Sequence, residues 1–268
     1  MKNDNPETPE LQPEDVFEGP IAPLTPRSRP GLALGMAAAV GMVSLLAQGA
    51  AIVAYMAVAD ATDPTFNAAA WAENAGSNGL ALSIGTWAGG VVAMPLLFFF
   101  AGRLSGGRAL EFLGWRGVSL KSVAGWVLAL LLFLVGYDVL SWWVEREVVP
   151  TFMRDVYLTA GHPVLLWLTL VVAAPVVEEF MFRGFLFAGL VRSPLGVAGT
   201  ALVTSLMWAM MHVQYDATII TMIFVVGLLL TAARQVTGSI IPCLAMHAAM
   251  NAGAMLELQY WLQMEAAG

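Results

Sequence analysis

The stretch that decides the fold is "PVLLWLTLVVAAPVVEEFMFRGFLFAGLV", residues 163–191, an apolar run interrupted by three ionisable side chains. Its length exceeds the about 20 residues that a helix needs to cross a bilayer. Glu178, Glu179 and Arg183 lie in its second half. A central Asp, Lys or Arg costs about 2.5–3.5 kcal/mol on insertion, whereas a Leu, Ile, Phe or Val returns only about 0.3–0.6. We therefore expect the three side chains to face the protein interior, to pair or to be neutralised, and such residues are candidates for function.

The composition is that of an integral membrane protein. Of 268 residues, 59% are hydrophobic and 12% are charged, whereas soluble domains carry about 25% charged residues. The net charge of −7 comes without a basic patch, so no nucleic-acid partner is indicated. The single cysteine, Cys243, excludes an internal disulfide and is expected to be a small buried residue.

The chain divides into a polar start and a series of apolar runs. Residues 1–30 are rich in Pro and Glu, and they predict a disordered cytoplasmic tail, while residues 31–268 predict a single transmembrane helical domain. Only helices and closed barrels satisfy the backbone in lipid, and the runs are too long for barrel strands. We expect an all-α, polytopic membrane helical bundle of about seven transmembrane helices, with about six to eight as the range. The runs lie near residues 32–59, 80–101, 122–144, 163–190, 196–212, 217–234 and 239–262.

The distribution of Lys and Arg predicts the orientation. With a cytoplasmic N-terminus, nine basic residues fall on the cytoplasmic side and two on the opposite side, and Arg183 lies within a span. An excess of Lys and Arg is typical of cytoplasmic loops. We expect a protein of a bacterial inner membrane with its N-terminus in the cytoplasm.

Helix geometry separates the two adjacent glutamates. Glu179 and Arg183 are four residues apart, so they share a helix face and can pair. Glu178 is turned away by about 100°. It is then a carboxyl in a dry setting beside another acid, which is suited to general-base work. The triplet alone is equally compatible with an ion-paired cluster that only joins helices.

Two further stretches place polar side chains on apolar helices. "LMWAMMHVQ" sets Trp208 and His212 four residues apart, and "CLAMHAAMNAG" does the same for His247 and Asn251. Each pair therefore shares one helix face. A lone histidine in an apolar helix is more often a satisfied core residue than a catalyst. Here two of three histidines fall inside predicted spans, while His162 is expected in an interfacial loop.

Helix depth allows these groups to meet. Measured from the presumed cytoplasmic helix ends, Glu178, His212 and His247 lie at about 20, 24 and 13 Å. The spread is within the error of the predicted boundaries together with helix tilt. The three side chains can therefore converge inside the bilayer.

Three motifs in this order resemble those of the CPBP intramembrane proteases. This family includes type II CAAX prenyl endopeptidases, lysostaphin resistance protein A-like proteins and "abortive infection" proteins. "EEFMFRG" resembles its EExxxR motif, "HAAMN" its HxxxN motif, and "WAMMH" its FxxxH motif, with Trp208 where Phe is usual. The resemblance covers about residues 160–255, and the aromatic exchange is expected to change little. It implies that Glu178 activates the attacking water and that His212 assists.

The resemblance also implies roles for the other motif residues. Glu179 and Arg183 would hold the site, whereas His247 and Asn251 would stabilise the oxyanion or bind a metal. Peptide hydrolysis needs a base for water, an acid for the leaving amine and donors aimed at the oxyanion, which these residue types can provide. Neither HExxH nor GxSxG occurs. Cys243, four residues before His247, is the one remaining nucleophile candidate.

The cofactor requirement has two readings. Two histidines and two glutamates can supply the three protein ligands of a catalytic zinc site. The candidate ligands for one divalent metal are Glu178, His212 and His247, with Glu179 in place of Glu178 as a variant. A metal-free mechanism based on glutamate is equally compatible with the motifs.

The favoured function is that of an intramembrane endopeptidase. Its substrates would be membrane proteins or lipidated peptides, including prenylated CAAX-type ones, and its other partner is the lipid bilayer. A proton-coupled transporter or channel could use Glu178, Glu179 and His212 as a relay, but the repeats or paired broken helices of transporters are not seen. A catalytically inactive immunity or scaffold protein on the same fold is the third reading, and the intact motifs argue against it.

Overall fold

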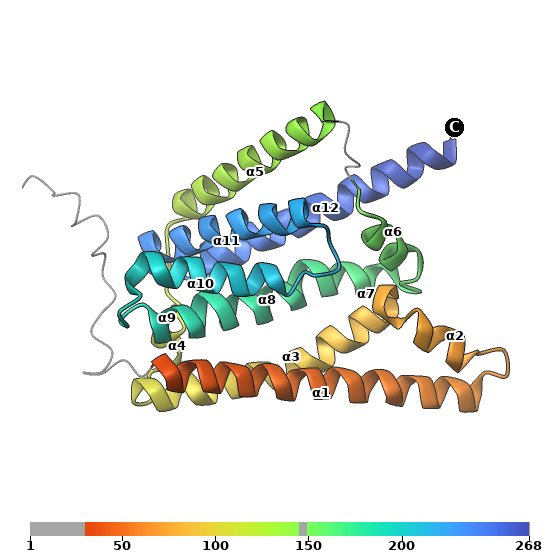
Figure 1. Ribbon diagram of the computed structural model, residues 1–268, viewed down its shortest axis with the longest axis horizontal. Helices are drawn as coiled ribbons and strands as arrows, with labels where there is room; N and C mark the ends of the chain where they lie inside the picture. Colours follow the sequence, from red (N-terminus) through yellow and green to blue (C-terminus); the bar gives the residue numbers. More distant parts are fainter. Residues whose placement is uncertain (1–29, 145–148, 268) are drawn as a thin grey trace, which may run out of the picture.

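The computed structural model describes residues 30–144 and 149–267, and all regular structure in these ranges is helical (Figure 1). The predicted all-α fold is therefore confirmed for this part of the chain. The predicted disordered tail lies outside the described residues, except for Pro30, which begins the first helix. His162 lies in an exposed loop between two helices, as expected.

The described residues contain long helices together with several short ones. The helices are α1 (Pro30–Thr62), α2 (Ala68–Glu73), α3 (Gly79–Ser105), α4 (Ala109–Phe112), α5 (Leu120–Trp143), α6 (Thr151–Leu158), α7 (Pro163–Leu168), α8 (Ala174–Glu179), α9 (Phe187–Leu190), α10 (Gly196–Met210), α11 (Ala217–Thr237) and α12 (Ile241–Ala267). A 3₁₀ turn, η1 (Ala75–Ser77), precedes α3, and two π-helical segments, η2 (Thr169–Ala173) and η3 (Phe180–Leu186), join α7, α8 and α9 into one continuous rod.

Five helical runs of the described chain are long and apolar enough to cross a bilayer, which makes this an integral membrane protein. They are Pro30–Thr62, Gly79–Ser105, Leu120–Trp143, Pro163–Leu190 and Ala217–Thr237. The other two predicted spans differ in character. The helix α10 has only 15 residues, and α12 has 27 but includes Asn251, Glu257 and Glu265. The expected count of about seven thus corresponds to five apolar spans, one short apolar helix and one long, more polar helix.

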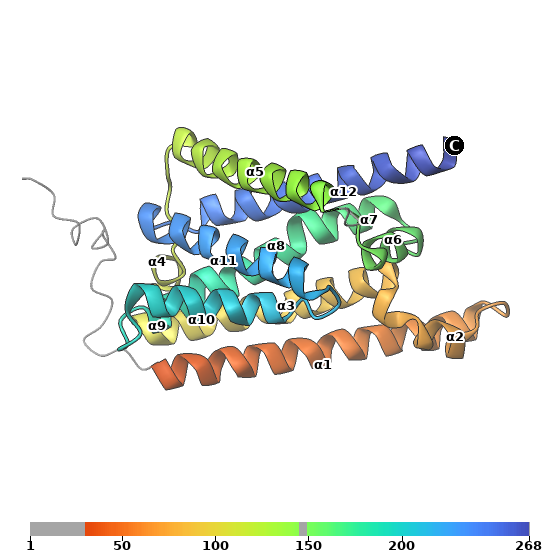
Figure 2. The ribbon, with the colours of Figure 1, turned by 45° about the horizontal axis from the view of Figure 1, so that its top comes forward.

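The rod α7–α9 lies at the centre of the bundle (Figures 1 and 2). On one side it packs against the pair α1 and α3, and on the other side against α10, α11 and α12. The helix α5 packs on α11 and α12, farthest from α1. The stretch with the two glutamates and Arg183 is therefore surrounded by protein, as its insertion cost requires.

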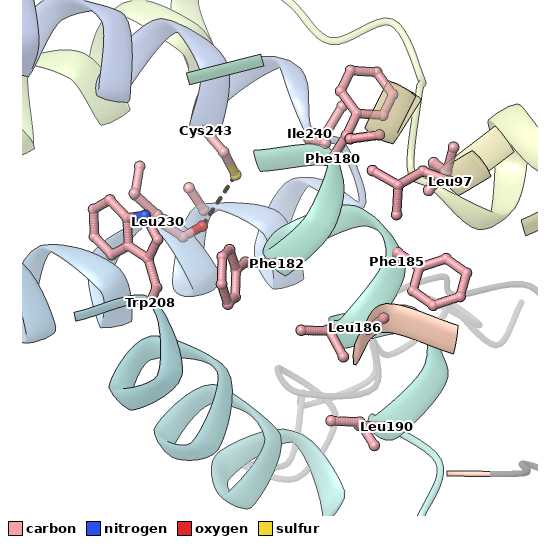
Figure 3. Packing of buried hydrophobic residues seen from close by; sticks show 14 of the residues in the cluster. Leu97, Phe180, Phe182, Phe185, Leu186, Leu190, Trp208, Leu230, Ile240 and Cys243 are labelled. Atoms are coloured by element: carbon pink, nitrogen blue, oxygen red, sulfur yellow. Dashed lines mark hydrogen bonds between the residues drawn. The ribbon is translucent and has the colours of Figure 1, made fainter. Parts of the chain in front are cut away.

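Around the second half of the rod lies the main hydrophobic core (Figure 3). Aromatic and aliphatic side chains of η3 and α9 pack there against neighbouring helices, and Phe185 and Leu230 are fully buried. Cys243 lies in this core and donates its thiol hydrogen to the Leu230 carbonyl, with 3.1 Å between sulfur and oxygen. It is the buried small residue that was expected.

Candidate active site

An ion pair buried in the core anchors the site. Arg183 Nη1 donates to Glu179 Oε1 at 2.9 Å, and the two side chains are 1% and 0% exposed. This is the pair that the helical spacing predicts. The guanidinium also donates to the Gly227 carbonyl at 3.3 Å and lies 4.3 Å from the centre of the Trp208 ring. Gly227 permits this close packing, because a Cβ there would lie 2.8 Å from Ser205 Cβ and 3.2 Å from Arg183 Nη2.

His247 lies between the two glutamates. Its Nδ1 is 2.9 Å from Glu179 Oε1, and its Nε2 is 4.0 Å from Glu178 Oε2. A carboxylate only accepts hydrogen bonds, so Nδ1 carries the hydrogen and Nε2 faces Glu178. Glu178 keeps 21% of its side chain exposed, whereas Glu179 is sealed. Adjacent residues of one helix thus have different surroundings: Glu179 is paired within the fold, and Glu178 has access to a small reactant.

Trp208 is the residue around which the site is arranged. Its indole Nε1 donates to Glu178 Oε2 at 2.5 Å, and the side chain is fully buried. The rings of His212 and His247 meet the indole edge to face, at 5.3 and 5.2 Å between ring centres. The expectation that Trp for Phe changes little is therefore incomplete, because a phenyl ring has no N–H to donate. The signal in the sequence was Trp at the Phe position of the motif, since Trp adds an N–H that can donate to a glutamate.

His212 lies just beyond its helix rather than inside it. The prediction of a span over residues 196–212 is too long, since α10 ends at Met210. Asp216, six residues later, caps α11 in an extended conformation, so His212 lies in the short turn that connects the two helices. His212 Nδ1 lies 2.9 Å from the Trp208 carbonyl oxygen. A carbonyl accepts, so Nδ1 donates and Nε2 is left for chemistry.

Tyr215 belongs to the same turn and was missed by the motif reasoning. Its ring stacks on His212 at 6.4 Å with an angle of 16°, and it meets Phe152 of α6 edge to face. Burial, and to a smaller extent the negative charge of Glu178, raises the pKa of the Tyr215 phenol. The phenol therefore stays protonated at neutral pH and supports one face of His212.

Asn251 makes a backbone contact instead of joining the Trp208 cluster. Its Nδ2 donates to the Leu170 carbonyl at 2.7 Å. In the π-helical register of η2, the Ala174 N–H bonds the Thr169 carbonyl five residues back. The next donor in that register would be residue 175, but Pro175 has no N–H. Asn251 thus supplies the donor that the proline lacks, and it ties α12 to the rod.

The structure therefore brings five of the predicted site residues together around Trp208. They are Glu178, Glu179, Arg183, His212 and His247. Asn251 is one helical turn from His247 and is bonded elsewhere.

The predicted metal ligands are not gathered into a metal-binding group in the described residues. Within residues 30–144 and 149–267, no group of three or more His, Cys, Asp or Glu side chains is placed to hold a metal ion. Glu178 Oε2 accepts from the indole, and both histidines are bonded through Nδ1, so a metal would use Oε1 of Glu178 and Nε2 of His212 and His247. Metal binding by these three residues stays a prediction.

Comparison with known proteins agrees with the motifs. Residues 160–253 match the family model described as type II CAAX prenyl endopeptidase Rce1-like. The resemblance drawn from the three motifs, expected over about residues 160–255, is confirmed for this segment, which contains every site residue named above. No curated protein and no solved structure matches the chain.

The buried ion pair is expected to be a stability element. Breaking a buried pair leaves an uncompensated charge, which costs about 3–5 kcal/mol. Glu179→Gln and Arg183→Ala should each lower the melting temperature of the detergent-solubilised protein. Arg154→Ala is the matched control, because its 3.0 Å pair with Glu265 is partly exposed and such pairs contribute about 0–1 kcal/mol. Equal melting temperatures for Arg183→Ala and Arg154→Ala would contradict this interpretation.

The contact between Asn251 and Leu170 predicts a compensating substitution. Asn251→Ala removes the donor to the partly buried Leu170 carbonyl, which costs at most the about 1–3 kcal/mol of a fully buried one. Pro175→Ala introduces a backbone N–H at the position that the π register requires, so the double variant should regain part of the lost melting temperature. Thermal unfolding of the wild type, both single variants and the double variant tests this. Losses that simply add in the double variant would refute it.

Proposed function

We propose that this protein is an intramembrane endopeptidase that hydrolyses peptide bonds of membrane-associated substrates with water activated by Glu178. The match over residues 160–253 supports a CAAX-type protease at the level of the family. The prenylated C-terminal peptide in that family's name is the substrate class we propose for this chain.

The observation that carries the proposal is the unequal environment of two neighbouring carboxylates. Glu179 is fully buried and bonded to Arg183 and His247, so its charge is committed to the fold. Glu178 is partly exposed and has one oxygen, Oε2, in a hydrogen bond. A general base must be within reach of the water it deprotonates. Only Glu178 of this pair meets that condition.

The reaction then needs few groups. Glu178 accepts a proton from water as the water oxygen attacks the carbonyl carbon of the scissile bond, forming a tetrahedral intermediate. Nε2 of His247 and Nε2 of His212 are the ring nitrogens turned away from their fixed Nδ1 bonds. A protonated Nε2 can donate to the oxyanion or to the leaving amine. As the C–N bond breaks, the proton that Glu178 took from water is returned to the leaving nitrogen, which yields a carboxylic acid and an amine. At neutral pH these two products become a carboxylate and an ammonium group.

Several finer assignments belong to the same proposal. The bias of Lys and Arg supports a cytoplasmic N-terminus, and we propose a bacterial inner membrane as the location. The ring of buried contacts around Glu179 supports a holding role for Glu179 and Arg183. For Asn251 we propose positioning of α12 through Leu170 rather than direct donation to the oxyanion.

The exchange Glu178→Gln tests the assignment of the base. It keeps the shape of the side chain and an oxygen for the Trp208 N–H, so expression and melting temperature should stay near the wild type. Cleavage of a farnesylated CAAX peptide by purified enzyme should fall at least about 100-fold, the lower end for loss of a general base.

Glu257→Gln is the control, because it makes the same exchange at an exposed position of α12 outside the cluster. The assays should contain EDTA, since carboxylate catalysis needs no metal. Normal cleavage by Glu178→Gln would overturn the assignment, and so would wild-type activity that appears only after zinc is added.

A further inference from the structure

The indole of Trp208 has a contact that packing alone does not require. Its ring faces and edges meet Arg183, His212 and His247. Any aromatic ring of similar size could make these contacts. The Nε1–H donated to Glu178 Oε2 at 2.5 Å is different, because it acts on the proposed base itself.

This bond limits how Glu178 can turn. A glutamate side chain has several staggered rotamers, and its terminal torsion is broad. Glu178 is the partly exposed member of the pair and has no ion pair with Arg183 to hold it. The indole bond engages Oε2, and Oε1 accepts no hydrogen bond from any residue in the described ranges. The carboxylate is thus held by one oxygen with the other left for a reactant.

We infer that Trp208 is a positioning residue of the hydrolysis: its indole N–H fixes the Glu178 carboxylate so that Oε1 faces the attacking water. This inference rests on the proposed function. Trp208, which belongs to α10, is fully buried and has Arg183 of the rod against its ring, so the surrounding side chains restrict its position. Because the Trp208 ring is held by its neighbours, its N–H holds the Glu178 carboxylate in one orientation. Misplacement of a reacting group by about 1 Å can cost about 100-fold in rate.

A second indole bond to the rod, from the more exposed Trp87, provides a control for this bond. Trp87 Nε1 donates to Thr169 Oγ1 at 3.0 Å, so it also links a neighbouring helix to the rod through an indole N–H. The Trp87 bond ends on a hydroxyl of the π segment η2, and no catalytic candidate takes part in it. Trp87→Phe therefore reports the cost of losing an indole bond without disturbing Glu178.

The experiment compares Trp208→Phe with Trp87→Phe on a farnesylated CAAX peptide, with rates referred to folded, monodisperse enzyme. We expect Trp208→Phe to lower kcat by about 10–100-fold with KM within about twofold, because geometry at the base is lost while substrate binding is kept. Trp87→Phe should keep kcat near the wild type. Equal kcat values for the two variants would overturn the inference.

A second comparison separates positioning from general support of the fold. Glu178→Asp shortens the side chain by one methylene and withdraws the carboxylate from the indole. In that background Trp208→Phe should have little further effect on kcat, because the bond is already broken. A tenfold or larger additional loss would show that Trp208 acts through packing. Trp208→Met serves in the same comparison if the Phe variant does not fold.

Including Glu178→Gln in the same assay keeps the two claims distinct. Normal cleavage by Glu178→Gln would end the proposed function and the inference together. If the Glu178→Gln variant does not cleave the peptide while the Trp208→Phe variant cleaves it at the wild-type rate, the proposed function is retained and only the role of Trp208 is refuted.

Discussion

The site depends on the buried ion pair between Glu179 and Arg183. Two charges removed from water are tolerated only with close geometry and additional hydrogen bonds, and here four helical elements contribute to them. The rod carries both charges, α11 supplies the Gly227 carbonyl, α12 supplies His247, and α10 places Trp208 against the guanidinium. The contacts that partly satisfy this pair in an apolar setting therefore join the elements of the site, while Glu179 Oε2 and Arg183 Nε have no hydrogen-bond partner among the described residues.

The same pair separates the roles of two adjacent carboxylates. A rotation of about 100° per residue prevents Glu178 from sharing the face of Glu179. Of the two glutamates, Arg183 pairs with Glu179, whereas Glu178 bonds the Trp208 indole and stays partly exposed. A stable charge and a reactive one can thus lie side by side. His247 contacts the first and faces the second, so the structural pair and the reactive group are linked through one imidazole.

The positions of residues along each helix were enough to predict part of the site from the sequence. The i,i+4 pair, the convergence of Glu178, His212 and His247, and most helix boundaries follow from the sequence. The bond from Asn251 to the Leu170 carbonyl could not be predicted, because it depends on a π-helical register that produces no periodic pattern in the sequence. Pro175 is the one residue that indicates this register. The place of His212 outside α10 depends on where Asp216 caps the next helix. The bond from Trp208 to Glu178 requires knowing which edge of the indole faces the rod.

The most direct test of water activation by Glu178 is a single turnover in H₂¹⁸O with enzyme in excess over a farnesylated CAAX peptide. We expect one ¹⁸O atom in the new carboxylate of the product and none in the enzyme, because water attacks the peptide directly. Mass spectrometry of the enzyme peptide containing Glu178 completes the measurement. ¹⁸O in the Glu178 side chain after that turnover would show that the carboxylate itself attacks the substrate, and it would contradict general-base catalysis.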